Sequence, residues 1–195
     1  MPKTPSNSIE LGTEAASFLL SDANGKAHKL SDFKGAPALL VAFISNRCPF
    51  VQLIRNEFAS FAREYQKKGL QVIAINSNDA ETHPDESIEA ISREVEEFGY
   101  SFPYLKDEEQ TVALAYGAAC TPDLFLFDGN RRLAYHGQFD DARPGNGKLV
   151  TGNDLRAATD AILAGKKPTA EQTPSIGCNI KWTAGNQPSQ FSSVA

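Results

Sequence analysis

The chain has 195 residues, 41% of them hydrophobic and 22% charged, with a formal net charge of -5. This length and composition predict one domain, or one domain with an added tail. The acidic balance leaves no surplus of basic residues to neutralise phosphates, which argues against nucleic-acid binding. No apolar run approaches the ~20 residues needed to cross a bilayer, and no apolar signal core is present at the start, so we expect a cytoplasmic protein.

The first part of the chain predicts a polar arm, a hairpin and a buried strand. Residues 1–12 are polar and are expected to form a flexible N-terminal arm. The segment 16–30 predicts a short hairpin, because Asn24 and Gly25 supply the positive φ that tight turns require. Residues 38–44 are apolar without alternation, which is typical of a central strand covered on both faces.

A long amphipathic helix is expected after Pro49, which suits the first helical turn because it has no N–H to leave unpaired. Apolar side chains recur at helical spacing from there until Gly69, a residue typical of helix ends. A second buried strand is predicted over 70–75, followed by a polar loop over 76–86 and a helix capped by Ser87.

The second half predicts a short helix over 108–116, then an antiparallel hairpin of strands 124–127 and 132–136. After a Gly- and Pro-rich loop, a last helix is expected to be capped by Asn153 or Thr151.

These elements give three segments: the arm, a domain over 13–167, and a tail over 168–195 with an anchored block at 176–182. The order of strands and helices predicts an α/β fold in which helices flank a mixed central sheet.

The three cysteines, Cys48, Cys120 and Cys178, are widely spaced and odd in number, so they do not form a small disulfide scaffold. In a reducing compartment such cysteines are either buried and inert or catalytic. Local context must decide between these two roles.

Cys48 lies where a predicted strand meets a predicted helix, the place where reactive groups gather in open α/β sheets. The helix start offers unpaired N–H groups and a partial positive charge, and Arg47 adds a full one. Both stabilise a thiolate, the nucleophilic form of cysteine. We therefore predict a reactive Cys48, while a passive packing role is the simpler alternative.

A second motif, Cys120-Thr121-Pro122, directly precedes the strand 124–127. Proline cannot donate to a sheet ladder, so Pro122 must start the strand or face an edge. The Thr121–Pro122 bond is a candidate cis peptide, although an ordinary trans proline at a strand start is the simpler interpretation.

Several motifs resemble known families. Residues 43–51 resemble the active-site strand, turn and helix of thioredoxins, and residues 121–127 resemble the cis-proline and following strand of that superfamily. Residues 16–35 resemble the opening of the alkyl hydroperoxide reductase/thiol-specific antioxidant branch, and the whole pattern is similar to the peroxiredoxin-like, redoxin-domain proteins of the thioredoxin family. The resemblance implies a thioredoxin-like fold, an antioxidant or thiol-exchange activity, and a nucleophile at Cys48.

The sequence departs from both family patterns around that nucleophile. Val51 replaces the second cysteine of the thioredoxin motif, Ala42 replaces its buried acid, and Arg47 replaces its tryptophan. The proline that peroxiredoxins carry upstream falls near Val41 and is absent, while Ser45 could stand in for their threonine hydroxyl.

Three functions follow. The leading one is thiol–disulfide exchange by Cys48, with Thr121 and Pro122 shaping the groove for a protein or small-molecule disulfide. The second is a thiol-dependent peroxidase, and the third is a redox-inactive module that binds extended peptides. Both redox cycles need a second thiol. Cys120, Cys178 and an external thiol reductant are the candidates to resolve Cys48.

No metal site or other cofactor is expected, and the oligomeric state stays open. The acidic residues Asp79, Asp85 and Glu86 predict a solvated loop, because they lack calcium-loop spacing. His136, on a predicted strand, could act as a base, but a lone strand histidine is usually a surface or core residue.

Overall fold

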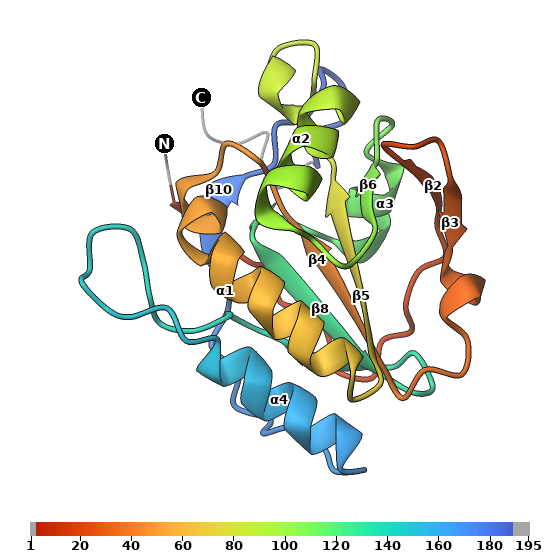
Figure 1. The fold of residues 1–195 in the computed structure, drawn as a ribbon, viewed down its shortest axis with the longest axis vertical. Coiled ribbons are helices and arrows are strands. Elements are labelled where there is room, and N and C mark those ends of the chain that lie inside the picture. Colours follow the sequence, from red (N-terminus) through yellow and green to blue (C-terminus); the bar gives the residue numbers. More distant parts are fainter. Residues whose placement is uncertain (1–2, 189–195) are drawn as a thin grey trace.

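A computed structural model describes residues 3–188 of the chain. Helices flank a mixed seven-stranded sheet with the strand order β3-β2-β6-β5-β4-β8-β9 (Figure 1). The strands of this sheet are β2 (Leu19–Asp22), β3 (Ala27–Lys29), β4 (Ala38–Phe43), β5 (Leu70–Asn76), β6 (Tyr104–Lys106), β8 (Asp123–Asp128) and β9 (Leu133–His136). The four α-helices are α1 (Pro49–Gln66), α2 (Ile88–Phe98), α3 (Thr111–Tyr116) and α4 (Asn153–Leu163).

The fully buried strand β4 divides the hydrophobic core into two layers. It runs parallel to β5 and antiparallel to β8. Leu40 and Ala42 face the layer under α1, α2 and α4, whereas Leu39 and Val41 face the layer under α3 and the N-terminal segment. Successive side chains of a strand point to opposite faces, so a strand covered on both faces must be apolar at every position. This confirms the predicted central strand and the α/β class.

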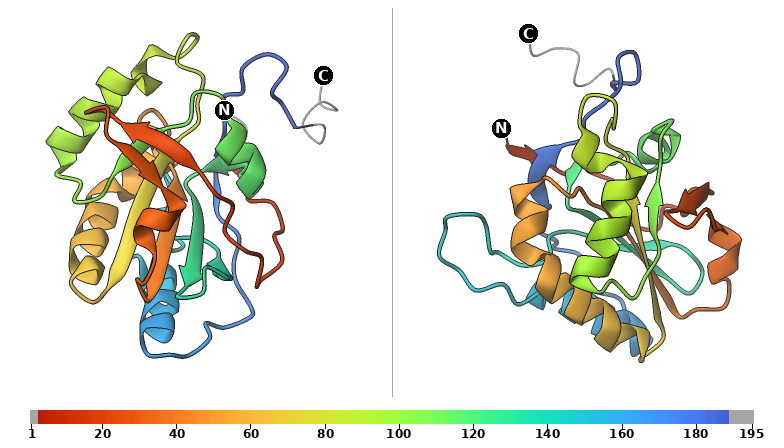
Figure 2. Two further views of the ribbon diagram at one scale, coloured as in Figure 1. Left: turned by 90° about the vertical axis from the view of Figure 1, so that its right-hand side faces the viewer. Right: turned by 45° about the horizontal axis from the view of Figure 1, so that its top comes forward.

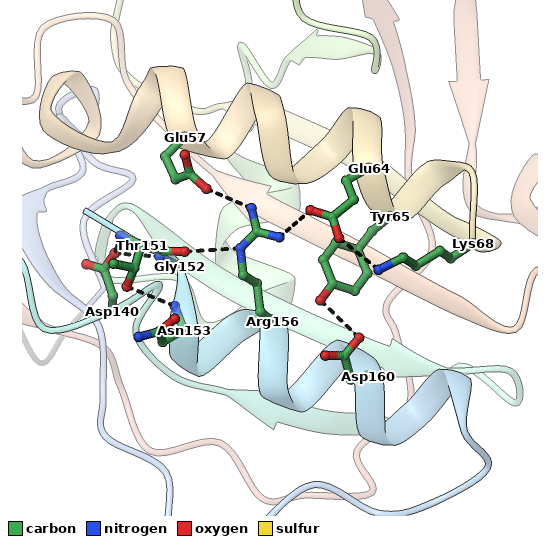
Figure 3. Close-up of polar contacts among 10 residues, drawn as sticks. All are labelled: Glu57, Glu64, Tyr65, Lys68, Asp140, Thr151, Gly152, Asn153, Arg156 and Asp160. Atoms are coloured by element: carbon green, nitrogen blue, oxygen red, sulfur yellow. Dashed lines mark hydrogen bonds and ion pairs between the residues drawn. The ribbon is translucent and has the colours of Figure 1, made fainter. Parts of the chain in front are cut away.

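Helices α1 and α4 pack side by side and are joined by Arg156 (Figure 3). Its Nη2 lies 2.7 Å from Oε1 of Glu57, and its Nη1 pairs with Glu64. Near the end of α1, the Tyr65 hydroxyl donates to Asp160 at 2.9 Å. One guanidinium that bridges two carboxylates of α1 fixes the angle between the helices more firmly than a single pair would.

A second, three-stranded sheet joins parts that are distant in sequence, in the order β1-β10-β7. Its strands are β1 (Lys3–Pro5), β7 (Cys120–Thr121) and β10 (Ile176–Asn179). Figures 1 and 2 show β1 and β10 together beside the start of α1. The expectation of a flexible arm over 1–12 is therefore wrong for residues 3–5, which pair with the tail.

Several smaller elements differ from those that the sequence pattern predicts. The short strand β6 lies just after Pro103 and pairs with both β5 and β2. The N-cap of α4 is Gly152, not Asn153 or Thr151. Gly152 has a φ of +67, and its ring neighbour Phe139 leaves no room for a Cβ there. Both conditions require glycine at the N-cap, which has no side chain of its own to cap the helix, although the Thr151 hydroxyl accepts a hydrogen bond from the Asn153 N–H at 3.4 Å.

Two short 3₁₀ helices complete the chain, η1 (Leu30–Phe33) and η2 (Pro84–Glu86). The second one lies in the segment predicted as a polar loop, and it carries a residue of the candidate site. Within residues 3–188, no helix is long and apolar enough to cross a membrane.

Candidate active site

Cys48 lies between the end of β4 and the start of α1, as predicted. It is the N-cap residue of α1, with extended backbone angles, and Pro49 follows at the first helical position. The Cys48 side chain is 2% exposed. A substrate must therefore reach its sulfur through a local opening.

The Thr121–Pro122 loop lies directly against the Cys48 sulfur. The peptide bond between these two residues is cis, so the ordinary trans interpretation is wrong. The Cys48 thiol donates to the Thr121 carbonyl oxygen, with Sγ 3.0 Å from that oxygen. The two motifs that the sequence singled out thus meet at one place.

A buried carboxylate shapes the turn that leads to Cys48. Glu86 is 2% exposed and accepts hydrogen bonds from the Ser45 hydroxyl at 2.5 Å and from the Asn46 and Arg47 backbone N–H groups at 3.1 and 3.2 Å. The Cys48 N–H donates to the Ser45 hydroxyl at 3.2 Å. The prediction of a solvated acidic loop is therefore wrong for Glu86. Its buried carboxylate accepts the hydrogen bonds of turn N–H groups that would otherwise have no partner.

The same carboxylate is fixed from the sheet side. Asn76, at the end of β5, donates its amide to Glu86 at 2.6 Å. The Tyr104 hydroxyl donates to the side-chain oxygen of Asn46 at 2.9 Å. Burial, and then the Glu86 charge, raise the pKa of Tyr104 well above its usual value. Tyr104 consequently stays a neutral donor, and the polar network under the turn is satisfied throughout.

The Arg47 guanidinium forms an ion pair with a carboxylate and is not reserved for Cys48. It pairs with Asp85, with Nε 3.4 Å from Oδ2, and both side chains are largely exposed. An exposed pair of this kind adds little stability. Arg47 nevertheless lines the opening above Cys48, so its charge is part of the entrance.

Cys178 lies next to Cys48. Its strand β10 pairs antiparallel with β7 so that Cys178 faces Thr121, whose carbonyl contacts the Cys48 sulfur. Burial, followed by its interactions with Cys48, raises the pKa of Cys178 to about 12, while Lys181 opposes this rise. Cys178 is therefore protonated at neutral pH.

Cys120 is buried deeper in the same small sheet. Burial, and then the charge of Asp123, raise the pKa of its thiol well above the usual value. Its sulfur contacts the Pro122 carbonyl oxygen at 3.6 Å and does not line the opening above Cys48. The geometry thus favours Cys178 over Cys120 as the neighbour of Cys48.

The opening above the two sulfurs is a small cavity of about 80 Å³. This volume accommodates a few heavy atoms and is far below the roughly 300–1,000 Å³ of a drug-sized pocket. Its lining combines both sulfurs with polar and charged side chains: Ser45, Arg47, Cys48, Asn78, His83, Glu86, Thr121, Cys178, Asn179 and Lys181.

His136 lies outside this cavity. Its Nε2 is 2.7 Å from Oδ1 of Asp123, both side chains are buried, and its ring stacks on Phe125. The histidine thus belongs to the sheet core beside the cis-proline. In the part of the chain that the structure describes, no cluster of three or more His, Cys, Asp or Glu side chains is arranged to hold a metal ion.

Sequence reasoning missed Glu86, Asn76 and Lys181 as site residues. Asn76 had a usable signal, because it directly follows the apolar run of β5, where strand ends deliver functional side chains. Glu86 and Lys181 had none, since they reach the site from a loop and from the tail.

Comparison with known proteins places these features in a family. Residues 11–136 match the model of the AhpC/TSA family. The thiol-disulfide oxidoreductase ResA of Geobacillus thermodenitrificans is 28% identical over 130 residues, which is 67% of this chain and 70% of that protein. ResA of Bacillus subtilis is 29% identical over 124 residues, 62% of this chain and 63% of that protein.

Two solved structures share nearly the whole fold. A hypothetical protein from Sinorhizobium meliloti 1021 has 66% identity and a TM-score of 0.92, over 93% of this chain and 100% of that one. An uncharacterized conserved protein from Geobacillus kaustophilus has 47% identity and a TM-score of 0.93, over 95% and 98%. A thioredoxin domain from Bacteroides vulgatus, at 17% identity and a TM-score of 0.58, shares the fold. The chain belongs to the AhpC/TSA family and is a thiol oxidoreductase with a thioredoxin-like fold.

Proposed function

We propose that the protein is a thiol–disulfide oxidoreductase in which Cys48 is the nucleophile and Cys178 the resolving thiol. The observation that carries this proposal is that two cysteines from distant parts of the chain line one cavity, beside the cis-proline. The names of the ResA relatives agree with this chemistry.

The cycle conserves atoms and electrons. The Cys48 sulfur, having released its proton to water, attacks one sulfur of the substrate disulfide, and the other sulfur leaves as a thiolate that water protonates. Cys178 then loses its proton to water and attacks the Cys48 sulfur, which expels the second substrate thiol. Two enzyme thiols are oxidised to one disulfide while the substrate disulfide is reduced to two thiols. An external thiol reductant restores the enzyme.

Capture of Cys48 activates Cys178. Burial raises the Cys178 pKa first, and the hydrogen bond and charge of Cys48 add to it. Once Cys48 is bonded to substrate sulfur, its negative charge is gone. Burial, the largest cause of the rise, remains and is opposed by the charge of Lys181, so the Cys178 pKa falls below about 12 but stays raised. Capture of Cys48 therefore favours the thiolate of Cys178.

The alternatives have less support. A peroxidase would need a free hydroxyl beside the nucleophile, but the Ser45 hydroxyl already donates a hydrogen bond to Glu86. A module for extended peptides would need an open strand edge beside Thr121, and β10 pairs there.

Mass spectrometry of the oxidised protein tests the proposal. The reduced protein is treated with a small disulfide and digested, and we expect a peptide pair linked through Cys48 and Cys178. Cys178→Ser should instead retain the substrate as a mixed disulfide on Cys48, and Cys48→Ser should retain nothing. Cys120→Ser is the matched control and should behave as the unchanged protein. A link through Cys120, or no link at all, would refute the two-cysteine cycle.

A further inference from the structure

The strand β10 covers the backbone edge at which an extended substrate would pair. Cys178 and Asn179 are in antiparallel register with Thr121 and Cys120, and β1 pairs along the other side of β10. An extended peptide that adds to a sheet needs free N–H and C=O groups on the edge strand. Here those groups of β7 are already used by the chain itself.

Strand β10 packs tightly on the Thr121–Pro122 loop. A Cβ atom at Gly177 would lie 1.8 Å from the Thr121 carbonyl oxygen. Only glycine permits this approach, so the strand is seated on the cis-proline loop itself. Access to the Cys48 sulfur is left to the cavity of about 80 Å³, which holds the end of a small molecule and no folded chain.

The basic and acidic side chains that line this cavity differ in how well they are paired. The Lys181 ammonium group donates to the Asn179 carbonyl and side-chain oxygens at 2.8 and 3.1 Å, and no carboxylate among residues 3–188 forms an ion pair with it. Arg47 meets only the exposed Asp85. The one carboxylate of the lining, Glu86, is turned toward the donors of the Cys48 turn.

We propose that the substrate is a small disulfide that carries a carboxylate near its sulfur atoms, and that Lys181 binds this carboxylate. The proposal rests on the proposed function and names its substrate class. The sulfur reaches Cys48 through the cavity while the carboxylate remains at the entrance, close to Lys181 and Arg47. The chemical step is the exchange described above, and the carboxylate takes no part in bond making.

A matched set of small disulfides tests the charge preference. The reduced protein is mixed in single turnover with 3,3′-dithiodipropionate, bis(2-hydroxyethyl) disulfide or cystamine, which are similar in size and carry negative, zero and positive charge. We expect the rate constant to fall in that order. The ratio of anionic to cationic substrate should shrink as salt is added, because salt screens partly exposed charges.

Lys181→Gln should lower that ratio by roughly five-fold, the effect expected of one partly exposed ion pair. The ratio is the readout because any change in folding or in Cys178 acidity acts on both substrates alike. Lys181→Arg keeps the charge and should keep the preference. Lys167→Gln is the matched control, since that exposed lysine lies just beyond the end of α4 and does not line the cavity.

The outcomes separate the two proposals. Cys48-dependent reduction with no charge preference, or with a preference that survives Lys181→Gln, overturns the substrate class and leaves the oxidoreductase cycle intact. A neutral disulfide-linked decapeptide that reacts faster than the small neutral disulfide overturns it too, because it would show that β10 does not close the edge. Absence of any Cys48-dependent reduction overturns the proposed function itself.

Discussion

Replacing Gly177 by alanine should uncouple the two proposed active-site cysteines, Cys48 and Cys178, without changing either sulfur. Gly177 precedes Cys178 on β10, and its Cα packs against the backbone of Thr121 and Pro122. An added methyl group would meet the Thr121 oxygen at 1.8 Å, the Thr121 carbonyl carbon at 2.6 Å and the Pro122 nitrogen at 3.2 Å. All three atoms belong to backbone, so no side chain can rotate away to make room.

The size of the effect follows from these distances. Real Cβ contacts essentially never fall below 3.0 Å, so β10 and the loop must separate by more than 1 Å. A misplacement of about 1 Å costs on the order of 10²-fold in rate when reacting atoms must meet in a fixed geometry. The overpacked strand should also lose about 1–3 kcal/mol of folding free energy.

The assay separates capture by Cys48 from resolution by Cys178. The reduced variant is mixed with a chromogenic disulfide, and the release of the first and the second thiol is followed in time. The first release should continue, whereas the second should slow by about two orders of magnitude. The mixed disulfide on Cys48 should then accumulate and be visible by mass spectrometry.

Gly129→Ala is the matched control. A Cβ at Gly129 would meet its nearest neighbour, the Pro37 carbonyl oxygen, at an ordinary 3.5 Å, so this variant should resolve at the normal rate. If Gly177→Ala resolved as quickly as Gly129→Ala, the seating of β10 on the loop would not position Cys178, and our account of the second step would be wrong.

Three further predictions follow from the same structure. Glu86→Gln places an amide donor among the four groups that donate hydrogen bonds to the Glu86 carboxylate, and it leaves a backbone N–H of the Cys48 turn unpaired. We expect a loss of about 1–3 kcal/mol of stability in thermal unfolding. Capture of substrate by Cys48 should slow at least ten-fold, because the unpaired N–H loosens the turn. Arg156→Met removes both ion pairs between α4 and α1 and should lower the free energy of unfolding by about 1–2 kcal/mol, measured by denaturant titration. Capture of substrate by Cys48 should be unchanged, and slower capture would contradict a purely structural role of Arg156. Resolution by Cys178 should become faster as pH rises, because the Cys178 thiolate is the attacking form. The apparent pKa of resolution, from stopped-flow rates of decay of the mixed disulfide, should lie below the value of about 12 that Cys178 has beside an unmodified Cys48. An apparent pKa at or above about 12 would contradict the activation of Cys178 by capture of Cys48.

Much of the fold could be predicted because its signals are local. The unbroken apolar run of β4 and the helical spacing after Pro49 each specify an element within one short window. Ser87 caps α2 through its hydroxyl, as expected from its place before the apolar pattern. The position of Cys48 between strand and helix followed from these two elements alone.

The remaining parts depend on contacts that no local window contains. The strand β6 is three residues long, and its pairing with β5 and β2 stabilises it more than its own composition does. Glu86 looked like part of a solvated acidic loop, because its burial arises only when η2 folds over the Cys48 turn. Arg47 was expected to serve Cys48, but its guanidinium finds Asp85 on the neighbouring loop.

The position of the second sulfur has a consequence for how the enzyme works. The place of the second thioredoxin cysteine is taken by Val51, which is buried in the core beneath α1. The candidate partner Cys178 comes instead from β10, which also closes the strand edge and brings Lys181 to the entrance. Resolution, edge closure and charge at the entrance therefore all depend on the seating of one tail segment. A perturbation that lifts β10 should remove the proposed resolving thiol, open β7 to extended chains and withdraw the Lys181 charge together, whereas in a helix-borne dithiol these three properties would be independent.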